Sequence, residues 1–191
     1  MLRPMAVYER LARQPASGGW WIGLRRPLFV ALLLGGCLSL VVSGRLTARV
    51  IAGGAVAWSF IPLFEVASFG AVRRFANIGV PFSRDVDLFF AGHGPWSVSL
   101  IAVAAVASFI PIQAATWTAS TPGLITLAAM AAAIAIWSGY IDFCFYRAVL
   151  GKARWTAVRA LLLQRAIAWS LAVVYFLGNA GWPLVADRLG L

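Results

Sequence analysis

The chain has 191 residues, of which 62% are hydrophobic and only 12% are charged, and its mean hydropathy is +0.86. Soluble domains are about 45–50% apolar and about 25% charged, so this composition excludes a single soluble core. A net charge of +10 could indicate a nucleic-acid-binding protein, but here the basic residues lie between long apolar runs. The composition therefore predicts an integral membrane protein whose basic residues set its orientation and contact anionic lipid headgroups.

A leader of 26 residues precedes the first apolar stretch and carries five arginines. It closes with an aromatic pair, Trp20–Trp21, and a basic pair, Arg25–Arg26, as is typical of a segment that enters a membrane. Pro27 follows and suits the first turn of a helix. We therefore expect a cytoplasmic leader over residues 1–26, a transmembrane domain over residues 27–191 and no cleaved signal peptide.

Five apolar stretches are long enough to cross a membrane as helices. They cover residues of about 27–43, 48–70, 96–117, 122–144 and 161–186. Trp96 and Trp117 bracket the third stretch, and a helix would separate them by roughly 31 Å, close to the thickness of the hydrocarbon core. The expected fold class is therefore all-α, a polytopic membrane protein with a five-helix transmembrane bundle.

The distribution of arginines predicts the orientation. Basic residues concentrate in the leader and after the second and fourth spans, whereas the connection at 118–121 has none. This pattern favours a cytoplasmic N-terminus and a periplasmic C-terminus. Arg45 and Arg49 would then lie outside, which leaves open whether the first two spans cross fully or form a re-entrant hairpin. Heavy use of Ala, Gly and Arg is typical of GC-rich bacterial genomes, so we expect the bacterial inner membrane.

The stretch SRDVDLFFAGHGPW, residues 83–96, is unusually polar for this chain and holds its only histidine. Four apolar residues recur there with helical spacing, at Phe82, Val86, Phe89 and Phe90. We expect a short amphipathic interfacial helix and then a tight turn into the third span. The candidate hinge residues are Asp85, Asp87, His93, Pro95 and Trp96. A metal site formed by Asp85, Asp87 and His93 is the alternative, although three ligands in no recognised spacing do not favour it.

Glu65, Asp142 and Arg165 are the ionisable residues nearest the membrane interior. With five spans, each lies one to two turns below the cytoplasmic surface, and antiparallel helices bring such depths together. The sequence therefore allows an intramembrane charge cluster, and such clusters are often functional because buried charge is costly. The alternative is that Asp142 and Arg165 only mark the ends of their spans.

The segment YRAVLGKARWTAVR, residues 146–159, mixes basic and apolar side chains. Its four basic residues are Arg147, Lys152, Arg154 and Arg159. We interpret the segment as a surface for anionic lipid headgroups, with a docking site for a partner protein as the alternative.

Several short features together resemble the YIP family of Ypt-interacting proteins. They are Arg26-Pro27 before the first span, the polar hinge before the third, Pro111 within it, and Thr156-x-x-Arg159-Ala160 entering the last. The resemblance covers residues 20–186 and implies a five-span protein with a cytoplasmic N-terminus. Eukaryotic members help to organise membrane traffic with small GTPases. The Gly-His-Gly-Pro-Trp segment departs from the family pattern, and no functional residues are carried over.

No nucleotide-binding, hydrolase or metal motif occurs in the chain. We therefore expect no enzyme, no catalytic residue, no cofactor or metal, and no nucleic-acid partner. The leading hypothesis is a membrane-organising or partner-binding protein in contact with lipids, either alone or as a homo-oligomer. A small transporter or channel-like protein is the alternative, which Pro62, Pro111 and Gln113 favour, and a membrane-anchor subunit of a larger complex is a third. Cys37 and Cys144 lie in apolar stretches and are expected to be free thiols.

Overall fold

The computed structural model describes residues 3–14, 19–75, 82–109 and 121–189, and these residues form helices without strands. The helices are α1 (Pro4–Ala12), α2 (Trp21–Ser43), α3 (Ala48–Trp58), α4 (Phe60–Phe75), α5 (Phe82–Ala91), α6 (Gly94–Phe109), α8 (Thr121–Ala148) and α9 (Arg154–Leu189). Within this described part, four helical stretches are long and apolar enough to cross a membrane. A fifth is added if α5 and α6, which meet at 48°, count as one bent span. The predicted all-α membrane fold is confirmed.

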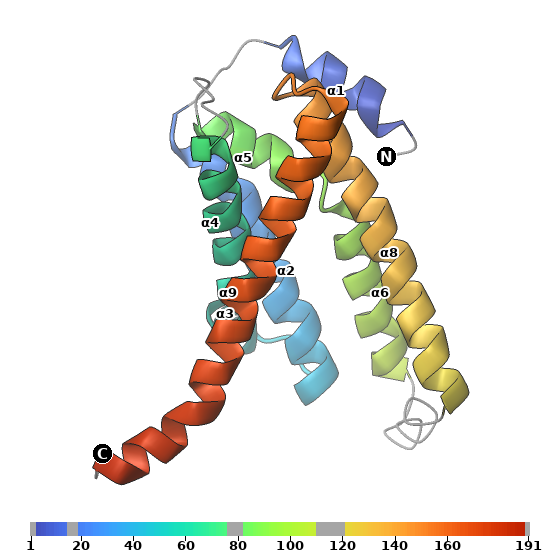
Figure 1. Cartoon of the computed structure of the whole chain (residues 1–191). Coiled ribbons are helices and arrows are strands. Elements are labelled where there is room, and N and C mark those ends of the chain that lie inside the picture. The colour runs from blue at the N-terminus through green and yellow to red at the C-terminus, as the bar shows by residue number, and fades with distance from the viewer. Residues whose placement is uncertain (1–2, 15–18, 76–81, 110–120, 190–191) are drawn as a thin grey trace.

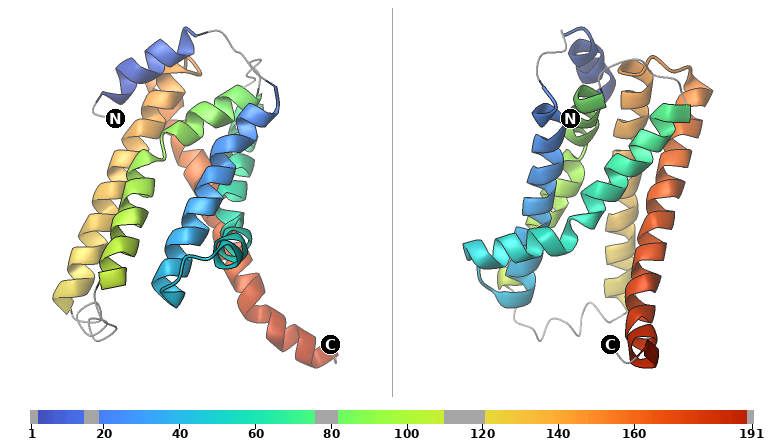
Figure 2. Two further views of the ribbon diagram at one scale, coloured as in Figure 1. Left: turned by 180° about the vertical axis from the view of Figure 1, so that it is seen from behind. Right: turned by 90° about the vertical axis from the view of Figure 1, so that its left-hand side faces the viewer.

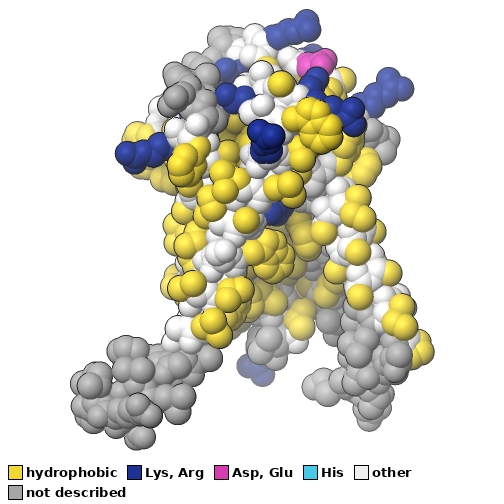
Figure 3. All heavy atoms as spheres, in the orientation of Figure 1, with side chains coloured by type: hydrophobic (Ala, Val, Ile, Leu, Met, Phe, Trp, Pro, Cys, Tyr) yellow, Lys and Arg dark blue, Asp and Glu magenta, His cyan; other side chains and the backbone are white. Residues whose placement is uncertain are grey.

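The helices run alternately away from and back to one end of the molecule, where α1 and α5 lie (Figures 1 and 2). Helices α2, α6 and α9 lead away from this end, and α4 and α8 return to it. We call it the basic end, because α1, α5 and the α8–α9 connection gather Lys and Arg side chains there (Figure 3). Helix α1 and the C-terminal part of α9 therefore lie at opposite ends of the molecule.

The first two spans form an antiparallel pair with a tight turn between them. Helix α2 ends at Gly44, whose φ of 63° places it in the left-handed region that glycine tolerates best. The hydroxyl of Thr47 then caps α3 by accepting a hydrogen bond from the Val50 amide. The stretches Trp21–Val41 and Ala48–Phe75 each meet the length and hydropathy of a span, which favours a full crossing over a re-entrant hairpin.

Small residues let α2 and α3 approach closely. A Cβ on Gly54 would stand 2.6 Å from the Ser39 hydroxyl and 2.7 Å from the Gly35 carbonyl oxygen, so no larger side chain fits without displacement. Gly53, in contrast, meets nothing within 4 Å. The close contact is therefore made by Gly54 and not by the adjacent Gly53.

Two predicted span ends were wrong. Pro27 was expected in a first turn, but α2 begins at Trp21 and holds Pro27 in its interior. Helix α4 was expected to stop before Arg73, yet it continues to Phe75, because the guanidinium of Arg73 is buried beside the Asp85 carboxylate, 3.3 Å away. A basic residue with a buried partner does not mark the end of a helix. Pro111, Gln113 and Trp117 lie outside the described residues.

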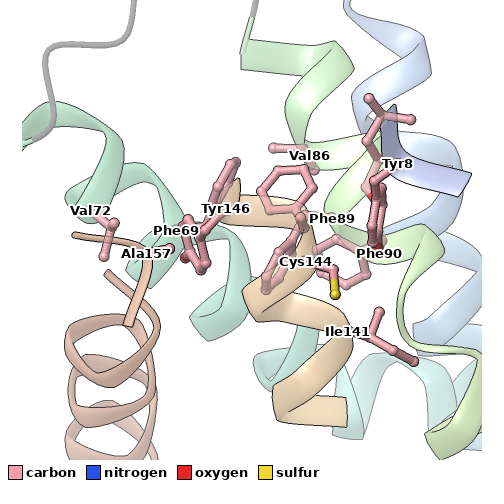
Figure 4. Packing of buried hydrophobic residues seen from close by; sticks show 12 residues of the cluster. Tyr8, Phe69, Val72, Val86, Phe89, Phe90, Ile141, Cys144, Tyr146 and Ala157 are labelled. Carbon is pink, nitrogen blue, oxygen red and sulfur yellow. The ribbon is translucent and has the colours of Figure 1, made fainter. Parts of the chain in front are cut away.

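Aromatic side chains build the core at the basic end (Figure 4). Phe69 of α4, Phe89 of α5 and Phe145 of α8 contact one another, with centroid distances of 5.0 Å from Phe69 to Phe89 and 5.6 Å for the other two pairs. All three side chains are fully buried. Stacked and edge-to-face rings add to the free energy of burying these large apolar surfaces. Cys144, a free thiol, is buried in the same core.

Helix α1, within the predicted cytoplasmic leader, belongs to this core. Tyr8 is fully buried, and its hydroxyl donates a hydrogen bond to the Leu88 carbonyl oxygen at 3.4 Å. Arg84 of α5 donates to the carbonyl oxygens of Leu11, Ala12 and Gln14, at 2.9, 3.3 and 2.6 Å. Leu11 and Ala12 are in the last turn of α1, where carbonyls lack partners four residues on, and Gln14 follows just beyond the helix. Arg84 therefore ties α1 to α5.

Candidate functional site

The structure brings Glu65, Asp142 and Arg165 together from α4, α8 and α9. One terminal nitrogen of Arg165, Nη1, stands 3.5 Å from Oε1 of Glu65. The other, Nη2, pairs with Oδ2 of Asp142 and donates to the Ser138 hydroxyl at 3.0 Å. The guanidinium therefore bridges two carboxylates that lie on different helices. We call these three residues the charge cluster.

Polar neighbours hold the charge cluster in place. Gln164, which is fully buried, donates through Nε2 to Oε2 of Glu65 and to the Ser68 hydroxyl, the latter at 3.1 Å. Ser68 in turn donates to the Glu65 backbone carbonyl at 3.0 Å. Trp96 of α6 donates from its indole nitrogen to the Ser138 hydroxyl at 3.0 Å. Hydrogen bonds therefore connect α4, α6, α8 and α9 at one depth.

The members of the charge cluster differ in exposure. The Asp142 side chain is only 3% exposed, whereas the side chains of Glu65 and Arg165 are 15% and 26% exposed. Two carboxylates face one guanidinium, so the formal charge of the cluster is −1 when both carboxylates are ionised. Removing one partner from a buried ion pair costs about 3–5 kcal/mol, because an uncompensated charge remains. The three residues therefore depend on one another.

The hinge residues occupy two different environments. Asp87 lies between the arginines of α2: Arg25 contacts it with two nitrogens, at 2.7 and 2.8 Å, and Arg26 approaches at 3.0 Å. Asp85 is paired with Arg73, so both carboxylates are neutralised by arginines. Helix α5 is consequently covered on its polar side as well as on its apolar side. No group of three possible metal ligands was found among the described residues.

His93, Pro95 and Trp96 lie at the turn from α5 into α6. Pro95 is the second residue of α6, as the sequence predicted for a span that begins at the turn. The His93 ring stacks on Phe90 at a centroid distance of 4.7 Å. Trp96 donates to the Ser138 hydroxyl, which also accepts from Arg165. The turn therefore lies beside the charge cluster rather than forming a separate site.

The predicted headgroup-contacting residues stand at the basic end, around the α8–α9 connection. Gly151, with φ of 59°, turns the chain, and α9 begins at Arg154 rather than near residue 161 as expected. Arg147, Arg154 and Arg159 are exposed, and Lys152 is half-buried. Trp155 is 71% exposed, and the Arg154 guanidinium lies 5.9 Å from the centre of its ring.

Sequence reasoning missed the uncharged members of the network, namely Ser68, Ser138 and Gln164. Serine is common in membrane helices and carries no signal by itself. Gln164 did carry a signal in the sequence, because it follows three leucines and adjoins Arg165. A buried amide in an apolar helix needs partners, so its position could have indicated the side of α9 that faces the charge cluster.

Comparison of the chain with protein-family models, curated proteins and solved structures finds no match. The resemblance to the YIP family therefore stays a prediction. What the structure establishes is a multi-span helical membrane protein by helix length and hydropathy.

Proposed function

We propose that the protein is a small membrane transporter or channel-like protein and that the charge cluster binds the cation that it moves. The observation that carries the proposal is Arg165 shared between Glu65 and Asp142 inside a bundle of spans. Ionisable residues within membrane spans are costly and rare, and they commonly mark ion or substrate pathways. The excess of carboxylates favours a cation over an anion.

The distribution of basic residues supports the orientation that goes with this proposal. The basic end would face the cytoplasm, with the N-terminus inside and the C-terminus outside, in a bacterial inner membrane. The charge cluster would then lie below the cytoplasmic surface. A cation would reach it from either side only if the helices around it separate.

Uptake into proteoliposomes tests the proposal. Vesicles with an inside-negative potential are given labelled sodium or labelled methylammonium outside. We expect the wild-type protein to admit at least one of them faster than protein-free vesicles. Asp142→Asn should lower this rate about tenfold or more, because the site loses one of its two negative charges.

A matched control is Glu9→Gln, which changes an exposed carboxylate on α1 away from the charge cluster. Its uptake rate should equal that of the wild type. Uptake no faster than in protein-free vesicles, or equal uptake by Asp142→Asn and the wild type, would count against transport through this site.

A membrane-organising role is the second candidate, and the exposed basic surface at the α8–α9 connection favours it. Arg154, Trp155 and Arg159 offer cationic and aromatic groups to anionic headgroups. If this role is correct, the protein should change the curvature of vesicles that contain anionic lipid, as seen by electron microscopy. Arg154→Gln with Arg159→Gln should abolish the effect. Unchanged vesicle shape with the wild-type protein would exclude this role.

A further inference from the structure

Immediately beyond the charge cluster, α8 and α9 separate and expose apolar side chains. On α8, Ala135 and Ala131 lie on the same face as Ser138, one and two turns before it, and both are exposed. On α9, Trp169 is 71% exposed, one turn after Arg165. Figure 3 shows a hollow on this face, between α9 and the α6–α8 pair, with hydrophobic side chains inside it. The charge cluster joins α8 and α9, the two helices that border this apolar hollow.

Buried polar atoms near the charge cluster lack hydrogen-bond partners. Within the described residues, Oε1 of Gln164 and the hydroxyl oxygen of Tyr146 are buried and accept or donate no hydrogen bond. Gln164 adjoins the cluster through its amide nitrogen, and Tyr146 lies one helical turn after Asp142 on α8. Buried polar atoms without partners cost free energy, so such atoms beside a functional cluster point to a ligand that pairs with them.

These observations define the chemistry of the ligand. The excess negative charge calls for one positive charge, and an anion would meet two carboxylates. Gln164 Oε1 is an acceptor and cannot donate, so it can pair with an N–H group of an organic cation. The apolar hollow that leads to the site would cover a hydrocarbon tail, which a fully hydrated cation lacks.

We propose that the charge cluster takes the ammonium group of an amphiphile, a primary amine whose hydrocarbon tail lies in the hollow between α8 and α9. This inference rests on the proposed function and names its substrate class. The ammonium group pairs with the carboxylates of Glu65 and Asp142 and donates a hydrogen bond to Gln164. The ligand enters from the bilayer along the hollow, so its tail need not cross water.

Three probes of equal chain length test the inference on the wild-type protein in phosphatidylcholine nanodiscs. Equilibrium dialysis measures labelled octylammonium, octyltrimethylammonium and octanoate, with empty nanodiscs as background. We expect octylammonium to bind at least tenfold more tightly than octyltrimethylammonium, which has the same charge but no N–H group. Octanoate should not exceed the background. This comparison needs no variant and is independent of any effect on folding.

Variants test whether octylammonium binds at the charge cluster. Asp142→Asn and Glu65→Gln should each weaken octylammonium binding about tenfold or more, whereas Glu9→Gln should leave it unchanged. Adding phosphatidylethanolamine to the nanodiscs distinguishes two sources of the same ammonium chemistry. Competition by this lipid would identify a membrane aminolipid as the ligand, and absence of competition would identify a free amine; both outcomes support the inference.

Equal binding of the two cations, binding of octanoate, or no binding above empty nanodiscs would overturn the inference. If octylammonium fails but Asp142-dependent uptake of sodium or methylammonium is observed, the substrate class is wrong and the proposed function stands. If that uptake is also absent, the proposed function fails with it.

Discussion

At the basic end, α1, α4, α5 and α8 bury one another's side chains, whereas in the opposite half α8 and α9 leave most of theirs exposed. The basic end combines an aromatic core with four paired acids, while the opposite half offers mainly apolar surface to its surroundings. In a bilayer, lipid covers such surface at no cost, so helices can separate there without losing stability. The comparison indicates that stability is concentrated at one end and that the other end is left able to move.

The largest expected effect comes from removing the cation of the charge cluster. Arg165→Gln should lower the free energy of unfolding by about 3–5 kcal/mol, because Glu65 and Asp142 then face each other without compensation. Reversible unfolding in mixed detergent micelles measures it, with Arg159→Gln, an exposed arginine on the same helix, as the control. Adding Glu65→Gln should recover part of the loss, and a double change that costs the sum of the single changes would show that the residues are not coupled.

Next in size is the aromatic core. Phe69→Ala should cost about 3 kcal/mol, because it removes a fully buried ring that packs against Phe89 and Phe145. Phe176→Ala, in the exposed half of α9, should cost about 1 kcal/mol or less. Equal losses for the two variants in the same unfolding assay would contradict the contrast between the two halves.

A smaller effect is expected where α2 and α3 cross. Gly54→Ala should cost about 1–3 kcal/mol, since its methyl group would press on Ser39 and on the backbone of Gly35. Gly53→Ala, one residue earlier, should be neutral or stabilise the protein by up to about 1 kcal/mol, because alanine favours the helix and meets nothing there. Thermal unfolding of the two variants under the same conditions measures this difference in stability. A crossing that tolerates both equally would not be close-packed.

The smallest effect concerns the contact of α1 with α5. Tyr8→Phe should cost about 0.5–1 kcal/mol, since it removes one long hydrogen bond to Leu88. Burial raises the pKa of the Tyr8 hydroxyl above its ordinary value of 10.0, so the folded state keeps this proton more firmly than the unfolded state. The contribution is therefore complete below pH 10 and is lost as the pH rises further. Unfolding measured from pH 8 to 11 should show a steeper loss for the wild type than for Tyr8→Phe.

Much of the fold could be predicted, because the hydropathy of a stretch shows directly whether its helix lies in lipid or in water. The ends of the helices were harder to predict. Arg73 and Pro27 are residues of the kind that usually mark a helix boundary, but tertiary contacts outweigh this tendency. Their expected depth in the membrane placed Glu65, Asp142 and Arg165 at one level. Depth alone does not show in which direction around the helix axis a side chain points. Ser138 could therefore not be assigned to the site before the face of α8 was known, whereas the amide of Gln164 in an apolar stretch gave a hint for α9.

The long sequence separation within the charge cluster has a consequence for synthesis in the membrane. Gln164 follows Glu65 by 99 positions, and Arg165 is the next residue. At 5–20 residues per second, the ribosome needs roughly 5–20 s to add this length of chain. Throughout that interval the carboxyl group of Glu65 has been made but its cation has not. Helix α4 must therefore be kept near water, or its carboxyl group protonated, until the last helix emerges, and the insertion of this small protein should be completed from its C-terminal end.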